Sequence, residues 1–147
     1  MADQPIPNAE PAGAIRRLFA MLYDAVLILA VLIVGTFLFL PLTGGEAVDG
    51  GIRFAFQAYL VLLAAGFYGF FWMRGGQTLG LRTWRLRLLR ADGGELELAD
   101  VGKRLVAGVV TLGPLALVSI PFHPRRLSLT DMLSGSVVVR QRMREVV

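Results

Sequence analysis

The stretch "RRLFAMLYDAVLILA", residues 16–30, begins with two arginines and carries one aspartate inside an apolar run. The apolar run continues to residue 40 and is interrupted only by Tyr23, Asp24 and Thr36. As a helix, residues 18–40 would be roughly 34 Å long, which is enough to cross a bilayer with some tilt. The stretch therefore predicts a transmembrane helix that holds an ionisable group.

The composition agrees with a membrane protein of one domain. Of the 147 residues, 55% are hydrophobic and 18% are charged, whereas soluble domains average about 45–50% apolar and about 25% charged residues. The net charge of +4 is explained by arginines retained on the cytoplasmic side of a membrane, so we expect no nucleic-acid partner. The chain has no cysteine, which excludes disulfides and thiolate metal sites.

Two further apolar segments follow the first. Residues 54–73 lie between Arg53 and Arg74 and predict a second transmembrane helix. Residues 104–122 are broken by Gly113-Pro114. This third segment is long enough to just cross the membrane, but the break also suits two half-helices that turn back.

The distribution of basic residues predicts the topology, because cytoplasmic loops are rich in arginine and lysine. It places the N-terminus and residues 75–103 in the cytoplasm. A full third crossing would put a strongly basic C-terminal tail outside, so we favour a broken or re-entrant third segment with the tail inside. The arginines of that tail are Arg125, Arg126, Arg140, Arg142 and Arg144.

The polar segment contains a strand pattern. Residues 83–90, "TWRLRLLR", alternate apolar and basic side chains, which is typical of a strand. The turn sequence at residues 92–94 and the alternation of residues 95–98 predict a small β-hairpin on the membrane surface. An interfacial amphipathic helix is the alternative. A strand predicted at residues 136–142 could pair with the hairpin.

The predicted fold class is thus an α-helical integral membrane protein with two clear transmembrane helices. A broken or re-entrant third apolar segment and a small cytoplasmic β-hairpin or strand element complete it. Residues 1–13 are polar and rich in proline, which predicts a disordered tail. Residues 14–147 form the single membrane domain.

Asp24 is the first candidate functional residue. An ionisable group inside a membrane helix is costly unless it is paired, and it indicates function by default. Arg17 lies nearly two turns earlier on the same helix face, about 10 Å away along the axis. That separation is long for a direct ion pair, so Arg104, Arg82 and Arg126 are further candidate partners for Asp24.

A second motif, "GGQTLG" at residues 75–80, directly follows the second predicted span. Its glycines, among them Gly76 and Gly80, permit a tight turn at the interface. Gln77 and Thr78 offer polar groups to exposed backbone. The motif predicts an interfacial turn after the helix.

Three motifs together resemble the RDD family of small bacterial membrane proteins, which is named for one arginine and two aspartates. "RRLFAMLYD" resembles the first-helix signature, with Arg17 and Asp24 as two of the three residues. "GGQTLGLR" with "LRLLRADGG" is similar to the segment after the second span. "LSLTDMLSGSVVV" resembles the closing motif, with Asp131 as the second aspartate. The resemblance covers roughly residues 12–140.

This resemblance implies a multi-pass protein of the bacterial cytoplasmic membrane. It implies a role in transport, which for some members is linked to sodium–proton exchange. The sequence departs from the family pattern at Leu81, where a basic residue is common, and at Thr130, where histidine is common. The single histidine, His123, lies elsewhere, so no role that depends on the family's histidine carries over.

Two functional hypotheses follow for the polar cluster of Arg17, Asp24, Arg104 and Asp131. In the first, the two aspartates bind a proton or cation, and an arginine tunes the carboxylate pKa. In the second, the aspartate–arginine pairs are structural clips in a non-transporting accessory or assembly protein. A chain of this size would need to form an oligomer in order to transport.

We expect no enzymatic activity, because the sequence has none of the common catalytic motifs such as HExxH, a Walker A loop or GxSxG. We likewise expect no catalytic residue, no cofactor and no metal site. The expected partners are the bilayer, in particular anionic lipid headgroups, and either further copies of the chain or another membrane protein.

Overall fold

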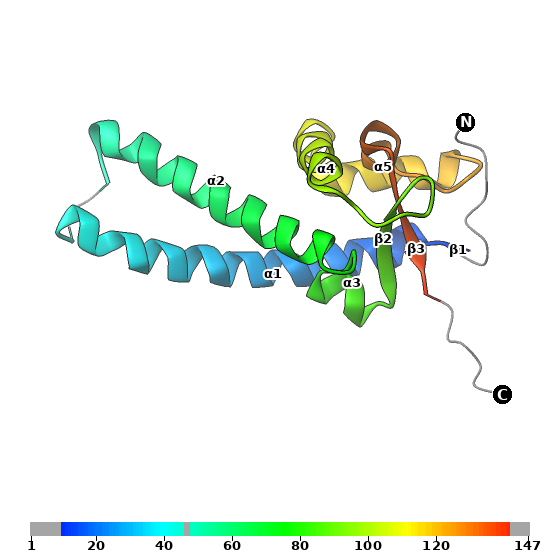
Figure 1. Cartoon of the computed structure of the whole chain (residues 1–147), viewed down its shortest axis with the longest axis horizontal. Helices are drawn as coiled ribbons and strands as arrows, with labels where there is room; N and C mark the ends of the chain where they lie inside the picture. Colours follow the sequence, from blue (N-terminus) through cyan, green and yellow to red (C-terminus); the bar gives the residue numbers. More distant parts are fainter. Residues whose placement is uncertain (1–9, 46–47, 142–147) are drawn as a thin grey trace.

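Two long apolar helices extend from a compact end that holds the sheet and the shorter helices (Figure 1). The computed structural model describes residues 10–45 and 48–141. Helix α1, Ala14–Phe39, continues into the 3₁₀ helix η1, Leu40–Thr43, and α2 is Gly50–Met73. Both are long and apolar enough to cross a membrane, which confirms the two predicted spans.

Each helix begins four residues before the predicted apolar run, because residues 14–17 and 50–53 are helical too. The side chain of Asp49 caps α2 by accepting a hydrogen bond from the amide of Gly50 at 2.6 Å. Only 6% of the most apolar window of each helix is buried within the chain. Their outer surfaces must therefore be covered by lipid or by another protein chain.

The third apolar segment is bent, as predicted. Helix α4, Leu98–Val110, and the 3₁₀ helix η2, Gly113–Phe122, meet at an angle of 89°. The chain turns there because Leu112 and Gly113 both have positive φ and Pro114 cannot continue a helix. With 13 residues, α4 is only about 20 Å long. It is too short to cross alone, and η2 packs against α1 and α5.

A three-stranded antiparallel sheet lies at the compact end. Its order is β1 (Glu10–Pro11), β3 (Ser136–Arg140) and β2 (Leu86–Arg90). The register places Leu88 opposite Val138. The pairing of the 83–90 segment with the C-terminal strand is thereby confirmed, and both segments must lie on one side of the membrane.

The prediction that residues 95–98 form the second strand of a hairpin is wrong. The turn forms as expected, with the amide of Arg90 donating to Gly94 at 2.9 Å. Glu97 then caps α4 in a reciprocal capping box with Asp100. A glutamate followed three residues later by an aspartate starts a helix here, so residues 95–98 are not available to pair with β2.

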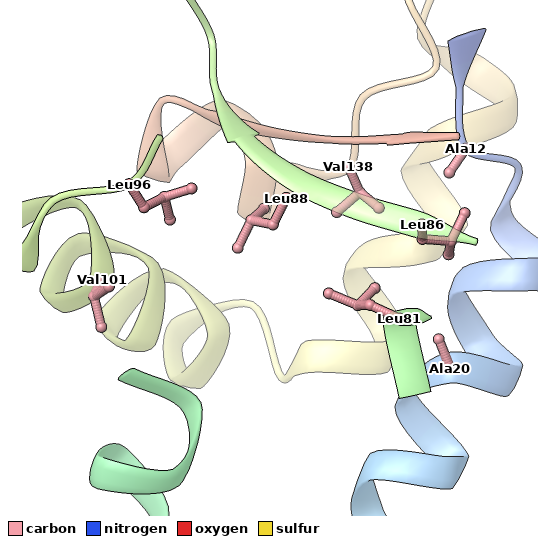
Figure 2. Packing of buried hydrophobic residues seen from close by; sticks show 8 residues of the cluster. All are labelled: Ala12, Ala20, Leu81, Leu86, Leu88, Leu96, Val101 and Val138. Atoms are coloured by element: carbon pink, nitrogen blue, oxygen red, sulfur yellow. The ribbon is translucent and has the colours of Figure 1, made fainter. Parts of the chain in front are cut away.

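The apolar core lies between the sheet and the starts of the helices (Figure 2). Leu86 and Leu88 of β2 are almost completely buried, and α3, Leu79–Thr83, contributes Leu81. The remaining members come from α1, α4, β3 and two loops: Ala20, Val101, Val138, Ala12 and Leu96.

The predicted disordered tail, residues 1–13, lies mostly outside the described residues. Glu10 and Pro11 differ from that prediction, because they form β1. Ala12 is also ordered: its amide donates to the carbonyl of Val138 at 3.1 Å, and its side chain is buried. Strand pairing and burial at these residues outweigh their polar, proline-rich surroundings.

Candidate functional site

Asp131 is placed by the local sequence of α5, Leu129–Ser134. Ser128 caps this helix, and its hydroxyl accepts a hydrogen bond from the amide of Asp131 at 3.2 Å. In return, the Asp131 carboxylate accepts from the amide of Ser128 at 3.1 Å. This reciprocal capping box holds the carboxylate, whose side chain has no exposed surface.

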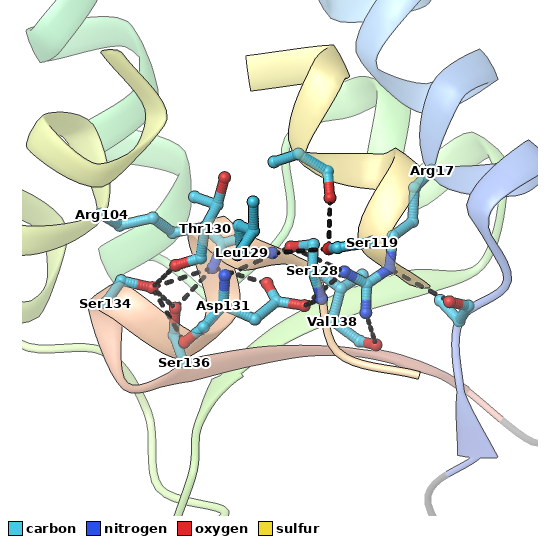
Figure 3. Close-up of polar contacts among 12 residues, drawn as sticks. Arg17, Arg104, Ser119, Ser128, Leu129, Thr130, Asp131, Ser134, Ser136 and Val138 are labelled. Atoms are coloured by element: carbon cyan, nitrogen blue, oxygen red, sulfur yellow. Dashed lines mark hydrogen bonds and ion pairs between the residues drawn. The ribbon is translucent and has the colours of Figure 1, made fainter. Parts of the chain in front are cut away.

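Two buried arginines reach this carboxylate from different elements (Figure 3). Arg17 of α1 donates from Nη1 to Oδ2 of Asp131. Arg104 of α4 donates from Nη1 to Oδ1 at 3.1 Å. Arg17 is 2% exposed and Arg104 is 7% exposed, so water screens neither ion pair effectively. We refer to Arg17, Arg104 and Asp131 as the Asp131 cluster.

The same arginines bind further groups at the compact end. Arg17 donates from Nε to the carbonyl of Ala12 at 3.1 Å and from Nη2 to the carbonyl of Val138 at 3.0 Å. Nη1 of Arg104 donates to the hydroxyls of Ser134 and Ser136. The Asp131 cluster therefore fastens α1 and α4 to α5 and the sheet.

Burial alone would raise the pKa of the Asp131 carboxyl, but Arg104 and Arg17 together lower that pKa below its ordinary value. Between the lowered pKa in the folded protein and the ordinary value of about 4, the unfolded chain binds more protons than the folded one. Stability is therefore fully present above pH 4 and is lost as the pH falls through the folded pKa.

This linkage predicts how the melting temperature of the detergent-solubilised protein changes with pH. We expect it to drop below pH 4 and to change little, through this group, between pH 5 and 7. Folded Asp131→Asn protein isolates the contribution, because it should lose part of the acid dependence. An identical acid profile in the wild type and the variant would contradict the assignment.

Asp24 has different hydrogen-bond partners from the residues of the Asp131 cluster. It accepts hydrogen bonds from the Thr78 hydroxyl and, at 2.9 Å, from the amide of Gly80. Over residues 10–45 and 48–141, no arginine or lysine lies within ion-pair distance of Asp24. The structure thus differs from the expected pairing of Asp24 with Arg17, Arg104, Arg82 or Arg126, because the start of α3 occupies its carboxylate.

The interfacial turn motif creates this arrangement. Gly76 has a φ of 67°, and its carbonyl accepts from the amide of Leu88 at 2.7 Å. Gln77 donates from Nε2 to the carbonyl of Leu86 at 2.7 Å, so the motif is fastened to β2. Thr78 caps α3 by accepting from the amide of Leu81 at 3.2 Å. The motif does more than end α2: it presents two donors to Asp24.

The close approach of α3 to α1 depends on glycine at position 80. A Cβ atom at Gly80 would collide with the backbone carbonyl of Ala20 and lie 2.8 Å from Cγ of Asp24. Only a residue without a side chain lets the amide of Gly80 reach the carboxylate. This contact explains why the motif needs its last glycine.

A cavity of about 390 Å³ connects the two polar sites. Arg17 and Arg104 line it from one site, and Asp24 and Thr78 line it from the other. Most of the remaining wall is apolar or aromatic and includes Trp72. Asp24 and the Asp131 cluster are therefore separate in their bonding but share one cavity.

The serines of the site were not predicted. The sequence does contain a signal for Ser128, since a serine followed three residues later by an aspartate is a capping-box pattern. Ser134 and Ser136 had none, because the chain folds them against Arg104 only through α5 and β3. Thr130, at the family's histidine position, shares a hydrogen bond with Thr111 at 2.7 Å. In the described part of the chain, no three potential ligands gather to hold a metal ion.

The comparisons with known proteins identify one family. The sequence pattern of the RDD family matches residues 11–135, a range that contains the Asp131 cluster, Asp24 and the turn motif. Searches of curated proteins and of solved structures found no match. Because the family match covers most of the chain, the protein belongs to the RDD family.

Proposed function

We propose that this protein moves a proton or a small cation such as sodium across the bacterial cytoplasmic membrane, with Asp24 as the binding group. The supporting observation is that Asp24 lies in the apolar helix α1 and lines the cavity, while no cation among the described residues neutralises it. A carboxylate can accept about four hydrogen bonds, and Asp24 accepts two. An ion or a proton donor can therefore bind it from the cavity.

The contrast with Asp131 supports this assignment. Both oxygens of Asp131 bind arginines, and its side chain is fully enclosed. Removing one partner from such a cluster leaves an uncompensated buried charge. We assign the Asp131 cluster to stability and Asp24 to ion exchange.

The basic residues support a cytoplasmic location for the compact end. Arg85, Arg87, Arg90 and Arg140 lie in or beside its sheet, whereas Arg53 lies in the first turns of α2 near the opposite end. By the positive-inside rule, the compact end and the N-terminus face the cytoplasm. Its arginines would then contact anionic lipid headgroups.

Two spans and one bent segment do not enclose a path across the bilayer. We propose that the transporting form contains more than one copy of the chain. The apolar outer faces of α1 and α2, which are largely exposed in the single chain, supply surface for such contacts.

Asp24→Asn tests the proposal in proteoliposomes. We expect sodium-driven or proton-driven flux to fall at least tenfold, while circular dichroism and the elution profile show a folded protein. Asp49→Asn is the matched control, since Asp49 caps α2 at the other end and asparagine caps helices equally well. That control should retain wild-type flux.

An absence of sodium or proton flux in the wild type would overturn the proposal. The alternative is then a membrane accessory or assembly protein in which Asp24 is a structural clip. Its two hydrogen bonds to Thr78 and Gly80, which fasten α1 to α3, favour that role. It predicts that Asp24→Asn lowers thermal stability and that the chain co-purifies with a membrane-protein partner.

A further inference from the structure

Arg104 uses only one of its three guanidinium nitrogens in the Asp131 cluster. Nη1 donates to Asp131, Ser134 and Ser136. Over residues 10–45 and 48–141, no group accepts a hydrogen bond from its Nε or Nη2. Since no fully enclosed side-chain nitrogen or oxygen in that part of the chain lacks a partner, both atoms retain accessible surface.

We assign that accessible surface to the 390 Å³ cavity, because Arg104 lines the cavity and is only 7% exposed. Its guanidinium lies over the ring of Trp72, 5.7 Å from the ring centre, and Trp72 lines the same cavity. The aromatic ring and Asp131 together hold the guanidinium plane in place. The edge formed by Nε and Nη2 is thus presented to the cavity in one orientation.

This edge has the shape of an oxyanion site. Two parallel N–H groups of a guanidinium match the two oxygens of a carboxylate or a phosphate. Two arginines surround one aspartate in the Asp131 cluster, so the cluster keeps a positive charge. Asp24 brings a negative charge to the cavity, and a proton or cation bound there would restore the excess of positive charge that favours an anion.

The apolar part of the cavity wall indicates that the ligand also carries an apolar group. Met21, Leu105, Val109 and Val138 line the cavity together with Trp72. The volume lies within the range of about 300–1,000 Å³ that small-molecule pockets occupy. A fully hydrated inorganic anion would leave this apolar wall without a partner.

We propose that the cavity binds an amphiphilic oxyanion, with its carboxylate or phosphate on the Nε–Nη2 edge of Arg104 and its apolar body against Trp72. The inference rests on the proposed function, because it names the solute that would travel with the ion at Asp24. The ligand is either a free organic acid or an anionic lipid headgroup with part of its chain. Both present the same chemistry to the site.

Quenching of Trp72 fluorescence by 4-bromobenzoate tests the proposal on the full chain in nanodiscs of zwitterionic lipid. With a nanodisc scaffold protein that lacks tryptophan, a Trp84→Phe background leaves Trp72 as the single reporter, since the sequence has two tryptophans. We expect saturable quenching by 4-bromobenzoate and at least tenfold weaker binding of the neutral 4-bromobenzamide. Equal binding of the two probes would overturn the proposal.

Arg104→Lys keeps a cation near Asp131 but removes the bidentate Nε–Nη2 edge. We therefore expect it to weaken 4-bromobenzoate binding at least tenfold in folded protein. Arg82→Lys is the control, because Arg82 is exposed on α3, and it should bind as the wild type does. Unchanged binding in folded Arg104→Lys would contradict the assignment. If Arg104→Lys does not fold, the comparison of charged and neutral probes on the wild type still decides.

Two further measurements distinguish a lipid ligand from a free acid, and this inference from the proposed transport. Displacement of 4-bromobenzoate by phosphatidylglycerol in the nanodisc would identify a lipid headgroup, and persistence of binding would identify a free acid. Binding is measured without flux. Flux without selective binding would therefore remove only this inference, and selective binding without flux would remove only the proposed transport.

Discussion

Asp131→Ala should destabilise the folded protein by about 3–5 kcal/mol, the usual cost of removing one partner from a buried ion pair. The substitution leaves Arg17 and Arg104 buried without their shared carboxylate. It also removes the capping box that starts α5. The measurement is the melting temperature and the folded yield of protein purified in detergent.

Glu95→Ala is the matched control for that prediction. Glu95 forms an ion pair with Arg87 at 2.9 Å, but its side chain is 70% exposed. Exposed ion pairs contribute at most about 1 kcal/mol, so the control should melt close to the wild type. A loss in Asp131→Ala no larger than that in Glu95→Ala would show that the Asp131 cluster does not hold the fold.

Gly80→Ala should have the second-largest effect, a loss of about 3 kcal/mol, the upper part of the usual range for overpacking. The added methyl group would collide with the backbone carbonyl of Ala20 and with the Asp24 carboxylate. Because backbone cannot rotate away as a side chain can, α3 must move and the hydrogen bond from Gly80 to Asp24 is lost.

Gly102→Ala provides a control of opposite sign. Gly102 lies inside α4, and a Cβ atom there would have no neighbour within 4 Å. Alanine favours a helix over glycine by about 1 kcal/mol, so this variant should melt at or above the wild-type temperature. If Gly80→Ala also melted as the wild type does, the close contact between α1 and α3 would be refuted.

The membrane architecture was predictable because it depends on local properties of the sequence. Apolar length predicted α1 and α2, and Gly113-Pro114 predicted the bend between α4 and η2. The alternation around Leu86 and Leu88 predicted β2. Its pairing with β3 followed from the requirement that the basic tail stay on the same side as the basic segment.

The partners of the buried charges were not predictable in the same way. Arg17 and Asp131 meet across more than one hundred residues, and only the family resemblance placed them together. Spacing placed Arg17 and Asp24 on one face of α1, but it could not show that α3 returns to that face. That return depends on Gly80 and on the fastening of Gln77 to β2, which are tertiary contacts.

The second arm of the hairpin was mispredicted because alternation and capping compete in residues 95–98. The alternation of leucine and glutamate is typical of a strand. Glu97 and Asp100 form a capping box that is equally legible in the sequence. The longer helix α4 buries Val101 and Arg104, and a hairpin strand at residues 95–98 could not replace that burial.

The central claim is that the two aspartates have different partners, and a pair of double-mutant cycles tests it directly. Free energies of unfolding are measured for Arg17→Met, Asp131→Asn and Asp24→Asn alone. They are also measured for Arg17→Met combined with each aspartate variant. We predict a coupling of about 1.5–3 kcal/mol between Arg17 and Asp131, and additivity within about 0.5 kcal/mol between Arg17 and Asp24. Equal or stronger coupling between Arg17 and Asp24 would contradict the account.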